Sequence, residues 1–117
     1  MGVYYDLVNY TRKEYISFHH IGGKKLSEIA GYPVTATLVT YYLLKYIGNQ
    51  ISFVADTDTQ WPFPDGTYAD LGSYRDVTDT MVEELVQYGY LADNGKEFLF
   101  KNDTESYVRR LRQTWNE

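Results

Sequence analysis

The sequence predicts a single α+β domain that spans residues 1–117. Segments with strand-like alternation are interspersed with segments in which apolar residues have helical spacing. Hydrophobic residues make up 44% of the chain and charged residues 23%, as in ordinary globular proteins, and 117 residues are enough for a core without disulfide bonds. The chain has no cysteine, which fits a reducing compartment, and we expect a cytoplasmic protein. No apolar run reaches the ~18 residues that a membrane-spanning helix needs, so no membrane association is expected.

The first half of the chain is predicted to begin with a β-hairpin and to continue into helices. Alternating side chains at 3–10 and 14–21 indicate two strands joined at residues 11–13. Residues 24–30 have the apolar spacing of a two-turn helix. Residues 34–47 carry apolar side chains at helical spacing and only one charge, which predicts a central helix buried around most of its circumference.

The second half is predicted to complete a mixed or antiparallel sheet and to end in a helix. Alternation at 50–55 indicates a third strand, and residues 79–88 have an amphipathic helical pattern. The dipeptide Asn94-Gly95 is a strong turn signal and predicts a hairpin that pairs 90–92 with 97–100. Residues 105–115, which carry three arginines, are predicted to form a C-terminal helix.

Residues 56–76 are the most informative stretch for function. They carry five acids against one base, although the net charge of the whole chain is only −5, and they contain four aromatic rings. Aromatic side chains among carboxylates are more typical of a recognition surface than of a linker. The predicted partner-binding residues are Asp56, Asp58, Trp61, Phe63, Asp65, Tyr68, Asp70 and Tyr74.

The residues that would support catalysis or metal binding are few. His19 and His20 are adjacent, so on a strand their rings would point to opposite faces and could not act as a pair. Residues 56–58 begin like a calcium-binding loop, but Trp61 stands where the loop needs glycine and Thr67 where it needs glutamate. We therefore predict no enzyme, no catalytic residue, no metal site and no cofactor.

Nucleic-acid binding is a separate alternative, because residues 77–101 have the helix and hairpin order of a winged-helix domain. The helix that would enter the groove carries Asp79, Glu83 and Glu84 and lacks Lys and Arg, whereas contacts to phosphates need cations. The acidic charge of the chain therefore disfavours a nucleic-acid partner.

The opening residues resemble a known group of proteins. The run YYDLVNYTRKEYI at 4–16, followed by GGKK at 22–25, resembles small bacterial proteins of uncharacterised function, some of which occur in toxin–immunity settings. The resemblance covers about the first third of the chain and implies no catalytic residue. What it implies is an inhibitor of the immunity type.

These observations predict a non-enzymatic binding protein, specifically an immunity protein that inhibits a basic toxin domain through its acidic and aromatic side chains. In this hypothesis the carboxylates meet Lys and Arg of the partner, while Trp61, Phe63 and Tyr68 act as anchors. Two alternatives stay open: a winged-helix-like regulator or adaptor, and an enzyme of unrecognised type. The sequence leaves the partner's identity and the oligomeric state open.

Overall fold

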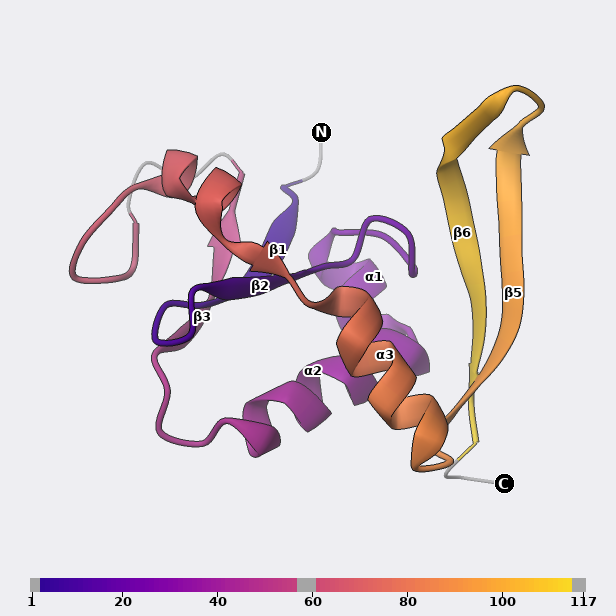
Figure 1. Cartoon of the computed structure of the whole chain (residues 1–117), viewed down its shortest axis with the longest axis horizontal. Coiled ribbons are helices and arrows are strands. Elements are labelled where there is room, and N and C mark those ends of the chain that lie inside the picture. The colour runs from indigo at the N-terminus through magenta and orange to yellow at the C-terminus, as the bar shows by residue number, and fades with distance from the viewer. Residues whose placement is uncertain (1–2, 57–60, 115–117) are drawn as a thin grey trace.

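The computed structural model describes residues 3–56 and 61–114 of the chain, and these form an α+β domain (Figure 1). Its elements are, in order, β1 (Tyr5–Asn9), β2 (Glu14–Ser17), α1 (Leu26–Gly31), α2 (Pro33–Lys45), β3 (Ile51–Ala55), the 3-10 helix η1 (Tyr68–Ser73), β4 (Arg75–Asp76), α3 (Thr78–Gln87), β5 (Leu91–Phe100) and β6 (Asp103–Gln113). The predicted fold class, the N-terminal hairpin and the mixed sheet are confirmed. In the described part of the chain, no helix has the length and apolar character needed to cross a membrane.

A four-stranded sheet in the order β3-β1-β2-β4 forms the centre of the domain. Strand β1 is antiparallel to both β2 and β3, and β4 pairs with β2 in parallel. Because side chains alternate along a strand, β1 contributes Leu7 to one hydrophobic cluster and Val8 to another. The sheet is therefore covered on both faces, by α2 on one side of β2 and by the segment 61–73 on the other (Figure 1).

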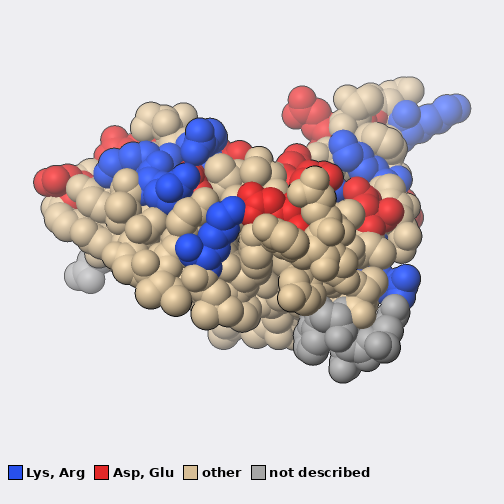
Figure 2. Space-filling view, turned by 60° about the horizontal axis from the view of Figure 1, so that its bottom comes forward, with Lys and Arg blue, Asp and Glu red and all other residues tan. Residues whose placement is uncertain are grey.

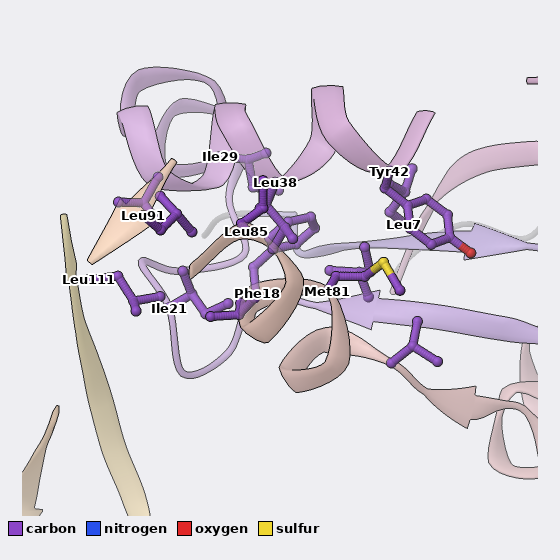
Figure 3. Close-up of a cluster of buried hydrophobic side chains, with 14 residues drawn as sticks. Leu7, Phe18, Ile21, Ile29, Leu38, Tyr42, Met81, Leu85, Leu91 and Leu111 are labelled. Atoms are coloured by element: carbon purple, nitrogen blue, oxygen red, sulfur yellow. The ribbon is translucent and has the colours of Figure 1, made fainter. Parts of the chain in front are cut away.

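The main core lies between the sheet and the helices. In Figure 3, Leu7 from the sheet, Leu38 and Tyr42 from α2, and Met81 and Leu85 from α3 converge. Residues from the base of the β5–β6 hairpin, Leu91 and Leu111, close one end of this core. The hairpin is thus held at its base, and the rest of it projects away from the domain (Figure 1).

Helix α2 begins at Pro33, and proline suits the first helical turn because that position needs no N–H donor. The side chain of Tyr42 in this helix is fully buried. The prediction of a helix here is confirmed, but the prediction that most of its circumference is buried is wrong. Leu44 is 64% exposed and Ile47, just beyond the helix, is 78% exposed. Figure 2 shows the consequence, a broad area without Lys, Arg, Asp or Glu on the face that carries α2.

The predicted C-terminal helix is wrong, because residues 103–113 form strand β6 paired with β5. Alternation explains the difference: Arg109 and Leu111 are buried, whereas Arg110 between them is exposed. The predicted turn at Asn94-Gly95 is also wrong. Those residues lie inside β5, where the register of pairing shifts, and Gly95 has a φ of +93°. Helix α3 is followed by a hairpin, as the winged-helix pattern predicted, but the second strand of that hairpin starts only after residue 102.

Candidate functional site

The segment 61–74 folds into a compact cap on the outer face of the sheet. Phe63 is only 9% exposed and packs with Val8 and Val54 of the sheet. Around these three lie the partly buried side chains of Tyr10, Tyr15, Trp61, Leu71 and Tyr74. Phe63 is therefore part of the domain's own packing rather than an exposed anchor as predicted.

Two local features hold this cap in shape. The indole N–H of Trp61 donates a hydrogen bond of 2.7 Å to the main-chain oxygen of Asp65 and closes the Pro-rich turn. The carboxylate of Asp70 accepts a hydrogen bond of 2.7 Å from the main-chain N–H of Thr67, which caps η1. Between them Gly66 has a φ of +96°, a conformation that side chains disfavour.

A cavity of about 350 Å³ opens where this cap meets the N-terminal hairpin. It is lined by Tyr10, Lys13, Asp65, Gly66, Asp70, Ser73 and Tyr74. The ring of Tyr10 stacks on Phe63 with 5.2 Å between the ring centres and 11° between the ring planes. Its hydroxyl donates a hydrogen bond of 3.1 Å to the Asp65 carboxylate, so the ring is fixed at both its face and its edge.

Lys13 places its ammonium group in this cavity. Its Nζ lies 3.2 Å from the centre of the Tyr10 ring and 5.6 Å from the centre of the Tyr74 ring. A cation over a ring face is attracted by the negative face of the π system. Lys13 comes from the turn between β1 and β2 and is the only described residue other than glycine with a positive φ, 56°. We call Tyr10, Asp65, Asp70 and Tyr74 the acidic-aromatic pocket.

The two tyrosines of the acidic-aromatic pocket resist ionisation. Removal from water, and then the neighbouring Asp65 carboxylate, raise the pKa of Tyr10. Burial, followed by the negative charge of Asp70, raises the pKa of Tyr74. Both rings therefore stay neutral at physiological pH, and among the described residues the carboxylates that line the pocket are those of Asp65 and Asp70.

The structure brings together five of the eight predicted site residues: Trp61, Phe63, Asp65, Asp70 and Tyr74. Asp56 lies apart at the end of β3, where its carboxylate accepts a hydrogen bond of 3.1 Å from the main-chain N–H of Tyr4. Tyr68 is 39% exposed and does not line the pocket. Asp58 lies outside the described residues.

The sequence reasoning missed Tyr10 and Lys13, although both contribute to the pocket. Tyr10 was interpreted as a strand residue, and Lys13 as part of a hairpin turn. The signal that could have found them is their place at the end of the hairpin. A lysine in a turn between two tyrosines can contact any segment that packs on the neighbouring face of the sheet.

A second cavity, of about 450 Å³, lies between the turn after β2, the start of α3 and the β5–β6 hairpin. Its lining includes both histidines, and here the expectation of opposed rings is wrong. Strand β2 ends at Ser17, so His19 and His20 lie in a turn with their ring centres 4.5 Å apart. His20 also stacks on Tyr107 at 3.8 Å, and its Nδ1–H donates a hydrogen bond of 2.8 Å to the Tyr107 main-chain oxygen.

The cations of this second cavity are neutralised within the domain. Lys24 forms an ion pair of 3.2 Å with the buried Asp6. Arg109 contacts Asp79 at 2.7 Å and Asp93 at 2.9 Å, and also Glu83. Burial, followed by the neighbouring His20 and Lys24, lowers the pKa of His19. Across residues 3–56 and 61–114, no three His, Asp or Glu side chains are grouped so that they could hold a metal ion.

An apolar groove of about 490 Å³ runs along the exposed side of α2. Its walls include Pro33, Thr40, Tyr41 and Leu44 from α2, Leu85 from α3 and Tyr90 beyond it. The sequence analysis did not predict this groove, because the apolar pattern of α2 was interpreted as burial around most of the helix circumference. It is the second surface on which a partner could dock.

No protein-family model, curated protein or solved structure matches this chain with significance.

Proposed function

We propose that this chain is a non-enzymatic binding domain that takes basic side chains of a protein partner into its acidic-aromatic pocket. The observation that carries the proposal is the convergence of Asp65, Asp70 and Tyr74 with Tyr10 around one cavity. Carboxylates beside ring faces are the chemistry that attracts ammonium and guanidinium groups.

The charge of the chain supports a basic partner. The net charge is −5, and residues 56–76 alone carry five acids and one base. Opposite charges on two proteins speed their encounter and make the association rate sensitive to salt. Together with the resemblance of the opening residues, this charge leads us to propose an immunity role, in which the partner is a basic toxin domain.

The alternatives have less support. In the winged-helix alternative α3 would face DNA, yet Asp79 and Glu83 on this helix are exposed and acidic. In the enzyme alternative the histidine cavity is the candidate, but its Lys24 and Arg109 already bind carboxylates of the domain. An absence of any gel shift with genomic DNA at low salt is the expected result for the binding function that we propose.

The test is affinity capture by the native domain, with the captured protein identified, produced separately and titrated by calorimetry. Asp65→Lys is expected to weaken that complex at least about tenfold, because it puts a like charge against a basic partner. Glu105→Lys is the matched control, because it makes the same charge change on the exposed β5–β6 hairpin. It is expected to change the affinity by less than about twofold.

The same titration separates the two docking surfaces. Leu44→Ser removes an exposed side chain from the apolar groove on α2 and leaves the acidic-aromatic pocket untouched. If Leu44→Ser abolishes binding while Asp65→Lys has no effect, the groove is the binding site and our proposal is wrong.

A further inference from the structure

We propose that the acidic-aromatic pocket is a site for the primary ammonium group of a lysine side chain, and that Lys13 occupies it in the unbound domain as an internal stand-in. This inference rests on the proposed function and names the group of the partner that is recognised. It also makes Lys13 a competitor that the partner's lysine must displace.

The position of the Lys13 ammonium group is the first argument. One face of the Tyr10 ring is stacked on Phe63, and the Lys13 Nζ lies 3.2 Å from the centre of the same ring. Since two groups cannot share one face at these distances, the ammonium group occupies the face that opens to the cavity. The ring is already oriented by its hydrogen bond to Asp65, so a cation that enters needs no rearrangement of Tyr10.

The second argument is that Lys13 is held weakly. Among the described residues, no carboxylate lies within 4.0 Å of its Nζ, so its contacts in the pocket are the ring faces of Tyr10 and Tyr74. Lys13 is also exposed, and a solvated cation–π contact is a modest interaction. By contrast, Arg109 in the second cavity is buried against three carboxylates. Of these two cations, Lys13 is therefore the one that an incoming cation can replace.

The third argument is the charge that surrounds the site. The carboxylates of Asp65 and Asp70 line the cavity together with the two tyrosines. Among the described lining residues a single exposed lysine faces two acids, so the pocket keeps an attraction for a further positive charge. In the same part of the chain, no second Lys or Arg lines the cavity to attract an anionic ligand.

The experiment uses Nα-acetyl-lysine methylamide as the probe, titrated into the full chain and followed by NMR. The indole N–H signal of Trp61 is the reporter, because Trp61 donates to Asp65 and its ring lies 6.3 Å from that of Tyr74. The variant Lys13→Gly removes the internal ammonium group and suits the positive φ of this position. We expect the variant to bind the probe about tenfold more tightly than the wild type.

Two controls isolate the effect of the vacated pocket. Lys96→Ala removes a lysine that lies 4.4 Å over the Tyr107 ring in the hairpin, so it makes the same charge change away from the pocket. It is expected to bind the probe as the wild type does. Nα-acetyl-norleucine methylamide has a side chain of similar length without the charge, and no saturable shift of the Trp61 signal is expected with it.

Equal probe affinities of the wild type and Lys13→Gly would overturn the inference, as would tighter binding by the arginine analogue than by the lysine probe. Lys13→Met gives the same comparison where Lys13→Gly fails to fold, because it keeps the aliphatic chain and removes the charge. The two proposals fail separately. A captured partner that tolerates Asp65→Lys contradicts the proposed function, even where Lys13→Gly strengthens binding of the probe. If the wild type and Lys13→Gly bind the probe equally, but Asp65→Lys weakens the complex with the captured partner, only the role of Lys13 is contradicted.

Discussion

The indole N–H of Trp61 donates a hydrogen bond of 2.7 Å to the main-chain oxygen of Asp65, and this bond closes the turn that shapes the acidic-aromatic pocket. The Trp61 ring also meets Phe63 edge to face, with 5.2 Å between the ring centres. The Trp61 side chain thus joins the turn at Asp65 to the small hydrophobic cluster around Phe63. The same turn places the carboxylate of Asp65 within hydrogen-bonding distance of the Tyr10 hydroxyl.

Trp61→Phe is expected to lower the free energy of unfolding by about 0.5–1.5 kcal/mol, because it keeps a ring but removes the donor of this hydrogen bond. Trp61→Ala is expected to cost about 2–3 kcal/mol, since it also removes the ring that Phe63 and Tyr74 meet edge to face. Urea denaturation followed by circular dichroism measures both. Equal losses for the two variants would show that the ring contributes nothing beyond its N–H group.

Gly66→Ala is expected to destabilise the domain by about 1–3 kcal/mol. The glycine has a φ of +96°, and a Cβ atom there would stand 2.6 Å from Oδ2 of Asp70. Gly72→Ala is the matched control in the same segment, because a Cβ atom there meets nothing within 4 Å and its φ is not positive. The control is expected to lie within about 1 kcal/mol of the wild type in the same denaturation assay.

Tyr42→Phe is expected to destabilise the domain by about 1–3 kcal/mol. The Tyr42 hydroxyl donates a hydrogen bond of 2.8 Å to Oε2 of Glu14, whose side chain is only 1% exposed. Without that donor, a buried carboxylate oxygen loses a partner that water cannot replace. Tyr41→Phe is the comparison, because its hydroxyl binds Glu84 near the surface; its loss is expected to stay below about 1 kcal/mol in thermal denaturation.

Arg109→Ala is expected to loosen the base of the β5–β6 hairpin and to lower the free energy of unfolding by about 1.5–3 kcal/mol. Arg109 is buried and contacts Asp79 of α3 and Asp93 of β5, so its loss leaves carboxylates facing one another. The neighbouring Arg110 forms an exposed ion pair with Glu97. Arg110→Ala is therefore the control, and it is expected to cost less than about 1 kcal/mol. Hydrogen exchange of the hairpin amides, measured alongside, shows whether the loss is local.

The pH dependence of stability is expected to change in opposite directions in two variants. Burial raises the pKa of Asp6 above its ordinary value of 3.8, despite the nearby ammonium group of Lys24, and the charges of Asp76 and Asp56 add to the rise. Folded Asp6 therefore holds its proton longer than unfolded Asp6, so its contribution to stability falls as the pH rises from 3.8 through the folded pKa. Asp6→Asn removes this fall.

The pKa of Asp103 is shifted in the opposite direction to that of Asp6. Hydrogen bonds from the main chain of Glu105 and from the Ser106 hydroxyl hold its pKa below 3.8. Its contribution to stability is therefore present above pH 3.8 and is lost as the pH falls through the folded pKa. Urea denaturation of wild type, Asp6→Asn and Asp103→Asn between pH 3 and pH 6 measures both differences. The same slope in all three proteins would contradict the two assignments.

Most of the fold could be predicted because it follows from local patterns. Strands β1 and β3 and helices α2 and α3 have strong alternation or helical spacing, and the structure places each within a few residues of the prediction. The C-terminal prediction failed where local signals conflicted. The arginines of 105–115 suit a helix, but the segment pairs with β5, because that arrangement buries Arg109 and Leu111 against the domain.

About half of the candidate site could be predicted, because acids and rings are concentrated in one short segment. The rest depends on contacts between residues far apart along the chain, such as Tyr10 and Asp65, which are 55 positions apart. No local pattern reports such a contact, since it is decided by which segment packs on the outer face of the sheet.

By itself the sequence determined the α+β class, the helices and strands with a clear period, the acidic charge and the aromatic character of residues 56–76. These are properties of composition and of neighbours along the chain. Only the tertiary structure decided that Phe63 is a core residue, that the rings of His19 and His20 lie side by side, and that the Lys13 ammonium group lies over the Tyr10 ring. Each of these results from burial against distant parts of the chain, and that burial is set by the packing of the whole domain.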